Sequence, residues 1–333
     1  MGERLISVVV AVYNTSEYLE QCLTQILNQT MPREQYEVII VNDCSTDHSL
    51  EIIRQFARQD ERIVVVDKKQ NEATFWCRYD GMVRAAGQYI LFADSDDWVE
   101  CDMLERLYCQ MEQTQSDILE FAYYVNHPDK QEVIVPLREG SYSVDSIVEM
   151  IGSRRMGAAL WHRLFRRELI KEAADYIAAH CSREEFRGIR NEDEYLFPLL
   201  LRFASKYDAY EKPVMHYRVG TSGSIMQELE KNVDKKCYHA QTLLHAGDFL
   251  VAGSRGNQIP HSCYVRMQCD NIFYLIGIIQ RFGRPDQWET VRQYFKKLKE
   301  EKKKFRPARY VKWNLHFLIR YAQLRWKLLR AAG

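Results

Sequence analysis

The chain has 333 residues, 46% of them hydrophobic and 12% aromatic, with 46 basic and 46 acidic side chains. This length and composition support a sizeable core and exclude an intrinsically disordered protein. The apolar runs are too short for a transmembrane helix, and the first of them, residues 5–12, turns polar too quickly for a signal peptide. Nine cysteines without a Cys-x-x-Cys pair are typical of reduced thiols, so we expect a cytoplasmic protein.

The N-terminal part of the chain alternates between short apolar runs and amphipathic segments. The predicted strands are residues 5–12, 36–41, 63–67 and 89–93, and the predicted helices are residues 16–28, 47–59 and 75–86. Near-continuous Val and Ile runs, such as residues 8–10, indicate strands that are buried on both faces. The pattern predicts an α/β fold with an open, wound, mostly parallel, Rossmann-like sheet. In such a sheet, ligands bind beyond the carboxyl ends of the strands.

The rest of the chain changes from mixed structure to helices. After a helix that follows Val99, the predicted strands are residues 117–126, 132–135, 160–165 and 214–219, and the predicted helices are residues 144–153, 167–179 and 192–203. Beyond Glu228 the hydrophobic period is helical throughout. We therefore predict an α/β domain at residues 1–226 and an appended α-helical C-terminal region at residues 227–333.

Three carboxylates stand directly after the fourth predicted strand, at Asp94, Asp96 and Asp97. Like charges this close raise one another's pKa, so a cation or hydrogen-bond donors are expected nearby. Oxygen ligands favour Mg2+ or Mn2+, which bind through one or two carboxylates plus phosphate oxygens. A polar turn that caps a helix is the alternative, and for Asp97 it stays open. Asn14 and Asp43 also follow parallel strands, which favours a metal site beside a hydrogen-bonding pocket.

Four motifs follow one another in a characteristic order. They are Ile-Ser-Val-Val-Val-Ala-Val-Tyr-Asn at residues 6–14, Val-Asn-Asp-Cys-Ser-Thr-Asp at residues 41–47, Ala-Asp-Ser-Asp-Asp-Trp at residues 93–98 and Asn-Glu-Asp-Glu at residues 191–194. Over residues 4–226 the chain resembles the family 2 glycosyltransferases of GT-A fold, particularly bacterial enzymes that build polysaccharide, capsule and lipopolysaccharide chains. The resemblance implies an inverting transfer of a sugar from a UDP-sugar to a hydroxyl of a saccharide or lipid-linked acceptor. It also implies Mn2+ or Mg2+ as cofactor.

The resemblance assigns residues to such a site. Those implied to bind the nucleotide sugar are Val12, Tyr13, Asn14, Asp43, Arg78, Asp94, Ser95 and Arg218. Asp96 would coordinate the metal ion that bridges the diphosphate. His216 is a second candidate ligand, although a lone His in a strand is more often structural. On the acceptor side the candidates are Trp161, which fits core packing equally well, and Glu192.

An acidic cluster opens the predicted helix at residues 192–203. By the resemblance, Asp193 is the general base that takes the proton of the acceptor hydroxyl. Glu192 and Glu194 are competing candidates, because successive helical residues turn by about 100° and only one can face the site. The alternative is an acidic first turn that the helix dipole favours, and the two interpretations are compatible.

The chain departs from the family pattern near the expected nucleotide pocket. Cys44 and Ala73 stand where the family has glycine. Phe75 and Tyr79 stand where it has serine and asparagine, whereas Arg78 is retained. The bulkier residues leave the identity of the donor sugar open.

The last segment of the chain is basic, since residues 296–330 carry thirteen Lys or Arg against two Glu. Its apolar residues from Val311 to Leu329 recur every three or four positions, which is typical of a helix lying on an anionic membrane surface. A peripheral position on the inner face of the plasma membrane would suit a lipid-linked acceptor. Packing on the α/β domain, or on a second subunit of a homo-oligomer, is the alternative. A nucleic-acid partner is not expected, because the segment lacks a recognised binding module.

Two other functions compete with glycosyl transfer. A sugar nucleotidyltransferase should carry a Gly-rich, basic phosphate loop after its first strand, and residues 11–15 have neither Gly nor a basic residue. A non-catalytic nucleotide-sugar-binding module would keep the nucleotide pocket but would have no need of Asp193.

Overall fold

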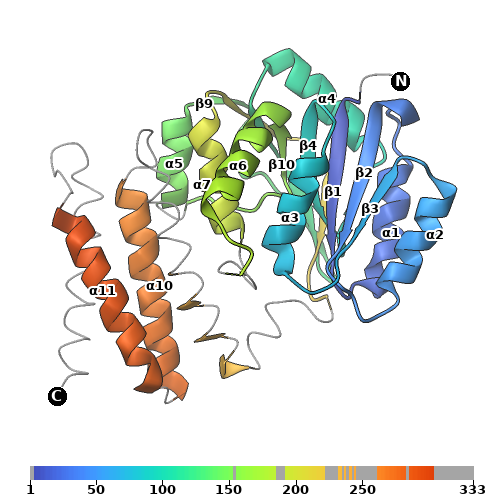
Figure 1. The fold of residues 1–333 in the computed structure, drawn as a ribbon. Coiled ribbons are helices and arrows are strands. Elements are labelled where there is room, and N and C mark those ends of the chain that lie inside the picture. The colour runs from blue at the N-terminus through green and yellow to red at the C-terminus, as the bar shows by residue number, and fades with distance from the viewer. Residues whose placement is uncertain are drawn as a thin grey trace. The chain divides into compact units, whose positions relative to one another are not determined.

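Figure 1 shows the computed structural model of the chain, which describes residues 4–152, 155–184, 192–221, 261–282 and 285–303, with short pieces between residues 232 and 244. The chain divides into two compact units. The first comprises Met1–Ser146 and Ala158–Ser224, and the second comprises Ile147–Gly157 and Ile225–Gly333. The predicted boundary at residue 226 lies outside the described residues.

The first unit is built on a large, mostly parallel sheet. Within the described ranges its strands are, in spatial order, β3 (Ile63–Asp67), β2 (Tyr36–Asn42), β1 (Ile6–Val12), β4 (Tyr89–Asp94), β10 (Arg163–Arg166), β6 (Ile118–Phe121), β11 (Tyr207–Tyr210) and β9 (Gly140–Tyr142). The four strands from β3 to β4 are parallel, as are β6 and β11, whereas β10 and β9 run antiparallel to their neighbours. The predicted α/β fold with a mostly parallel sheet is therefore confirmed.

Helices cover both faces of this sheet (Figure 1). They are α1 (Ser16–Leu27), α2 (Ser49–Gln59), α3 (Ala73–Arg84), α4 (Met103–Thr114), α6 (Arg167–His180) and α7 (Asp193–Phe203). Alternate residues of β1 serve the two faces, because side chains of a strand point to opposite sides in turn. Val8 and Val10 belong to the core cluster that includes α1 and α4, whereas Val9 contacts α3. A Cβ atom at Gly81 would lie 2.2 Å from Val9 Cγ1, so glycine allows α3 to pack directly on β1.

The predicted strand at residues 117–126 is two strands in different sheets, so this prediction is wrong. β6 ends at Phe121, and β7 (Tyr123–Asn126) belongs to a second sheet, in which the order is β5 (Trp98–Val99), β12 (Met215–Arg218), β7 and β8 (Gln131–Ile134). The chain changes sheet at the buried Ala122, whose N–H donates to Tyr210 O and whose carbonyl accepts from Val214 N–H. The alternating pattern continues across this residue, which is why the sequence did not reveal the change. β5, β9 and β11 were also not predicted.

The second unit is helical in its described part. Its helices include α10 (His261–Phe282) and α11 (Trp288–Lys303), and α5 (Val144–Gly152) crosses between the two units in sequence. Ile272, Ile276 and Ile279 of α10 are buried in one apolar cluster with Val291 of α11. The predicted helical C-terminal region is thus confirmed, while the predicted basic helix beyond residue 304 lies outside the described residues. Although α10 has 22 residues, neither it nor any other described helix contains an apolar stretch sufficient for crossing a membrane.

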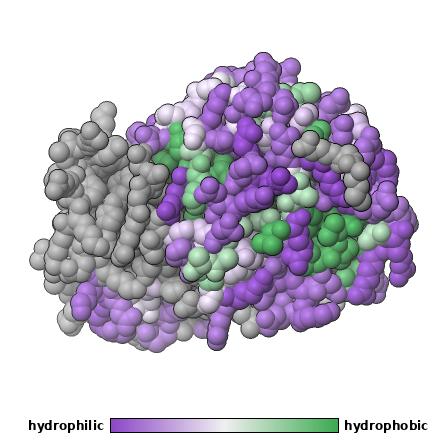
Figure 2. Space-filling model, turned by 45° about the horizontal axis from the view of Figure 1, so that its top comes forward, coloured by the Kyte–Doolittle hydropathy of each residue, from purple (hydrophilic) through white to green (hydrophobic). Residues whose placement is uncertain are grey.

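The surface of the described residues is mainly hydrophilic on the face shown in Figure 2, and its hydrophobic areas are separate patches. Large apolar residues that are exposed include Val64 and Val65 on the edge strand β3, Val133 on β8 and Tyr217 on β12. Exposed apolar residues that stand singly are usual on globular proteins.

Candidate active site

The carboxyl ends of β1, β2 and β4 meet at one edge of the large sheet, because the parallel register aligns their last residues. Asn14, just beyond β1, accepts a hydrogen bond from Thr46 N–H at 2.8 Å. The N–H of Asp43, just beyond β2, donates to the Val12 carbonyl, also at 2.8 Å. Asp94 is the last residue of β4. Three predicted site residues therefore lie along one edge.

Asp43 connects this edge to the start of α3. Its side chain is buried, and its two carboxylate oxygens accept hydrogen bonds from the N–H groups of Glu72 and Ala73, both at 2.8 Å. Burial raises the pKa of Asp43, and these hydrogen bonds and Lys68 oppose that rise. Because the first N–H groups of a helix carry partial positive charge, Asp43 stabilises the α3 N-terminus. Each carboxylate oxygen has a second lone pair, so Asp43 retains capacity to accept a hydrogen bond from a ligand.

Three non-glycine residues near Asp43 have a left-handed backbone. The φ angles are 53° at Asn14, 59° at Cys44 and 67° at Ala73. This region costs roughly 1–2 kcal/mol for a residue with a Cβ atom, with Asn tolerating it best. Cys44 and Ala73 are the two positions at which the family pattern has glycine. The backbone that glycine would adopt is therefore kept here at the cost of strain, as is common around ligand sites.

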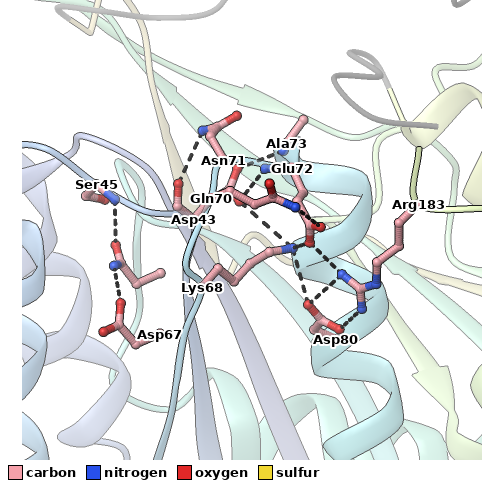
Figure 3. A network of polar contacts seen from close by, with 11 residues as sticks. Asp43, Ser45, Asp67, Lys68, Gln70, Asn71, Glu72, Ala73, Asp80 and Arg183 are labelled. Carbon is pink, nitrogen blue, oxygen red and sulfur yellow. Dashed lines mark hydrogen bonds and ion pairs between the residues drawn. The ribbon is translucent and has the colours of Figure 1, made fainter. Parts of the chain in front are cut away.

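A buried network of charges supports the start of α3 (Figure 3). The Lys68 ammonium group, on a side chain 6% exposed, lies 2.6 Å from Glu72, 3.2 Å from Asp80 and 3.9 Å from Asp43. Arg183, which follows α6, donates to Glu72 and Asp80 at 2.5 Å. Sequence reasoning missed Lys68, Asp80 and Arg183, because Arg183 stands 111 residues from Glu72. The network joins the segment after β3, helix α3 and the segment after α6.

Lys68→Met is expected to lower the free energy of unfolding by about 3 kcal/mol at pH 7, because it removes the buried cation that Asp43, Glu72 and Asp80 share. Burial by itself raises the pKa of Glu72, but the hydrogen bond and charge of Lys68 lower that pKa below its usual value. A lowered carboxylate pKa contributes stability above the unfolded pKa, and this contribution is lost as the pH falls through the folded value. The difference between wild type and variant should therefore shrink toward pH 4.

Urea denaturation at both pH values measures this difference, and Lys69→Met is the matched control. The Lys69 side chain is 91% exposed, so its loss is expected to change the unfolding free energy by less than about 0.5 kcal/mol. Equal urea midpoints for the two variants would show that the buried Lys68–Glu72 pair contributes nothing to the free energy of unfolding.

Arg78 of α3 joins three carboxylates from distant parts of the chain. Its side chain is 4% exposed, and its guanidinium lies 3.0 Å from Asp94 and 2.9 Å from Glu192 and also pairs with Asp193. Glu192 and Asp193 stand at the start of α7. Burial raises the pKa of both acids, that of Glu192 to about 7, while Arg78 acts in the opposite direction. The structure therefore brings the predicted base and its neighbour beside a predicted nucleotide-binding residue.

The turn after β4 is bound to β12 through Arg218. Asp97 Oδ1 accepts from Arg218 N–H at 2.8 Å, and Arg218 Nε donates to the Asp96 carbonyl at 2.9 Å. Burial, followed by repulsion from Asp96 and Asp94, raises the pKa of Asp97 well above its usual value. The alternative that Asp97 caps a helix is wrong, since α4 begins only at Met103.

Residues 7–173, half of the chain, match the family described as glycosyl transferase family 2. The chain belongs to this family. GlyG, a glycosyltransferase of Streptococcus pneumoniae, is 41% identical over 67% of this chain and 73% of its own. A poly(ribitol-phosphate) beta-glucosyltransferase of Bacillus spizizenii is 43% identical over 34% of this chain. This chain spans only 18% of that enzyme and 64% of EpsH of Bacillus subtilis, which is 30% identical.

Solved structures confirm the GT-A type of fold. TarS 1–349 of S. aureus, in complex with UDP-GlcNAc, has a TM-score of 0.58 at 18% identity and covers 89% of both chains. The mannosyltransferase PcManGT of Pyrobaculum calidifontis, in complex with GDP-Man and Mn2+, has a TM-score of 0.51 at 15% identity over 100% of this chain and 85% of that one. At these identities the likeness concerns the fold alone.

The surroundings of Asp96 in this family 2 glycosyltransferase fit a divalent cation. Burial, with Asp94 next, raises the pKa of Asp96, so a bound cation would offset an unfavourable concentration of negative charge. The buried Oδ2 of Asp97 accepts no hydrogen bond from the described residues. Those residues contain no group of three or more His, Cys, Asp or Glu arranged to hold a metal. One or two carboxylates suffice, however, where diphosphate oxygens complete the coordination.

Two further predicted site residues have mainly structural surroundings. The His216 ring is stacked between Trp98 and Tyr124, with ring centres 4.8 and 4.5 Å away. Its Nε2 lies 2.8 Å from Glu100. These contacts favour a structural role for His216 over metal coordination. Trp161 is only 8% exposed, which favours the packing alternative for its ring.

The remaining residues assigned to the nucleotide differ in exposure. Tyr13 is 47% exposed and offers its ring for stacking, whereas Val12 is buried in the core. Ser95 is buried, and its hydroxyl accepts a hydrogen bond from Thr15 Oγ1 at 2.9 Å. Val12 and Ser95 are therefore withdrawn from solvent, whereas Tyr13 presents its side chain to it.

Proposed function

We propose that this glycosyltransferase moves a sugar from a UDP-sugar to a hydroxyl of a saccharide or lipid-linked acceptor, with inversion, in cell-surface polysaccharide synthesis. The observation that carries the proposal is the position of Arg78, which holds Asp94 and Asp193 in one cluster. A nucleotide-binding carboxylate is thereby adjacent to a candidate base. The UDP-GlcNAc complex of TarS supports UDP as the nucleotide, and the B. spizizenii enzyme supports a surface polymer as the product.

The nucleotide would bind across the ends of β1 and β2. The exposed ring of Tyr13 stacks on uracil, and Asp43 accepts a hydrogen bond from the uracil ring N–H. Because two backbone N–H groups of α3 orient the Asp43 carboxylate, this acceptor is fixed before the nucleotide arrives. Asp94 faces the ribose side of the same edge.

The diphosphate would lie beside Asp96. Asp96 and the phosphate oxygens would hold Mn2+ or Mg2+, which would supply Lewis-acid stabilisation of the negative charge on the leaving UDP. Arg218 adds a fixed positive charge, since its guanidinium is held against the Trp98 ring at 4.5 Å and bonded to the Asp96 carbonyl.

Asp193 would act on the acceptor. It takes the proton of the acceptor hydroxyl as that oxygen forms a bond to the anomeric carbon and the bond to UDP breaks. Attack from the side opposite UDP inverts the configuration. The charge of Arg78 opposes the rise in the pKa of Asp193 that burial causes, and Arg78 orients the Asp193 carboxylate.

The alternative functions have less support. A nucleotidyltransferase is disfavoured because β1 ends in Val12, Tyr13 and Asn14 and not in a Gly-rich basic loop. A module that only binds a nucleotide sugar has no need for the acidic pair at the start of α7.

A screen of UDP-sugars for UDP release, with GDP-mannose as the control donor, tests the proposal. We expect release from at least one UDP-sugar in the presence of Mn2+ or Mg2+, its loss on chelation with EDTA and its recovery on addition of metal. Asp96→Asn should weaken UDP binding in Mn2+ and leave UDP binding in EDTA unchanged. Release that is equal in EDTA would contradict the metal role, and release from GDP-mannose alone would contradict UDP as the nucleotide.

A further inference from the structure

Tyr217 and Trp161 form a stacked aromatic pair in the first unit. Their ring centres are 5.3 Å apart and the ring planes differ by 8°. Trp161 is 8% exposed and is also held edge-on by Tyr123 at 4.6 Å, whereas Tyr217 is 38% exposed. The pair therefore has a rigid buried member and a member that presents aromatic surface to solvent. Core packing explains the burial of Trp161 but does not explain why the aromatic ring of Tyr217 is exposed.

The pair adjoins the donor side of the candidate active site. Arg218, the next residue on β12, is bonded to both Asp96 and Asp97. Burial, followed by the charges of Asp97, Asp96 and Asp94, raises the pKa of the Tyr217 hydroxyl.

The pair is also connected to the helix that carries the candidate base. Trp161 lies two residues before Arg163, whose guanidinium carbon is 3.9 Å from the Phe197 ring centre on α7. The first residue of α7 is Asp193. The segment that carries Trp161 therefore contacts the helix that begins at the candidate base.

The residues beside Tyr217 indicate the kind of ligand. Strand pairing puts Val125 opposite Tyr217, and the same face of the small sheet carries Tyr123 and Ile134. Glu132, opposite Val125, is the charged member of this row, and the Lys130 ammonium group pairs with it. An aromatic and apolar surface suits the C–H face of a neutral sugar ring, and the Glu132 carboxylate beside it disfavours an anionic polyol phosphate.

We propose that Tyr217, backed by Trp161, is the platform on which a neutral pyranose ring of the acceptor stacks. The inference rests on the proposed glycosyl transfer and deepens it, because it names the acceptor-binding residue and the chemical class of the acceptor. Trp161 acts through Tyr217, as a positioning residue that keeps the tyrosine ring in place.

Saturation-transfer NMR on the full chain with UDP and Mn2+ tests this platform. The probes are the methyl glycosides of glucose, N-acetylglucosamine and mannose, with ribitol 5-phosphate as the anionic probe. The wild type is expected to saturate the ring C–H protons of at least one glycoside, and to do so more strongly than those of ribitol 5-phosphate. Tyr217→Ala should weaken that binding by at least about fivefold, and Tyr217→Phe, which keeps the ring, by less than about twofold.

A matched control and a second variant keep the result interpretable. Tyr274 of α10 is 39% exposed, and Tyr274→Ala is expected to bind the glycosides as the wild type does. Tyr217→Leu keeps the apolar volume without an aromatic ring and should weaken glycoside binding by at least about fivefold. It serves as the test variant if Tyr217→Ala fails to fold. Absence of glycoside binding by the wild type, equal binding by Tyr217→Leu, or preference for ribitol 5-phosphate would overturn the proposal.

The two levels of inference fail separately. Binding of the glycosides is measured without turnover of the donor, whereas the proposed transferase function is tested by UDP release. If the protein releases UDP and its glycoside binding is unchanged by substitution of Tyr217, the proposed transferase function stands and the proposed acceptor platform is rejected.

Discussion

Asp193→Asn is expected to lower the rate of sugar transfer by about 100- to 10,000-fold, the range for loss of a positioned general base. Asparagine keeps the shape of the side chain and an oxygen that can accept from Arg78, but it cannot take a proton. The Kd for UDP should change by less than about threefold, because the nucleotide would be held by Tyr13, Asp43 and Asp96. Transfer assays with isothermal titration of UDP measure both quantities.

Glu194→Gln is the matched control for the base, since Glu194 is the next acidic residue of the same helical turn. It is expected to retain transfer to within about threefold of wild type, because successive helical residues face different directions. Full transfer by Asp193→Asn, or an equal loss in Glu194→Gln, would reject the assignment of the base.

The pH profile gives the base a second readout. Burial, opposed by Arg78 and reinforced by Asp193, raises the pKa of Glu192 to about 7, and transfer should therefore rise as the acidic pair loses its proton near that pH. Glu192→Gln should move this limb to lower pH, because it removes the member of the pair whose pKa is about 7. Stability changes in the opposite sense. A raised carboxyl pKa contributes stability that is fully present below the usual value of 4.5 and is lost as the pH rises through about 7.

Arg78→Met is expected to lower the free energy of unfolding by about 3–5 kcal/mol and to abolish transfer. The substitution leaves Asp94, Glu192 and Asp193 together in a buried place without their shared cation. Arg78→Lys restores a charge but not the planar fork that spans several carboxylates, so it should recover part of the stability and little of the activity. Urea denaturation and UDP-release assays measure the two effects.

Arg84→Met provides the comparison on the same helix. Arg84 is exposed and donates to the Asp80 carbonyl, so its replacement should cost less than about 0.5 kcal/mol. If Arg78→Met unfolded at the same urea concentration as Arg84→Met, the three-carboxylate cluster would not depend on Arg78.

Local patterns were sufficient for the elements that form the site edge. The runs at residues 5–12, 36–41 and 89–93 became β1, β2 and β4, with ends shifted by a single residue. Hydrophobic runs and turn residues determine secondary structure over a few neighbouring positions, so a single sequence is enough to predict these strands. The break at Ala122 could not be predicted, because the alternation of apolar and polar residues continues across it while the chain moves to another sheet.

By itself, the sequence determined that Asn14, Asp43 and Asp94 stand at the ends of parallel strands and that an acidic pair opens a later helix. Only the tertiary structure decided which of these groups become partners. Arg78 meets Asp193 across 115 residues, and Asp97 meets Arg218 across 121. Such pairs depend on how α3, α7 and β12 pack around the sheet edge, and the spacing of residues along a chain does not contain that information. The exposed ring of Tyr217 is a consequence of the same packing, because burial of Trp161 beneath it is set by two strands and a loop that are distant in sequence.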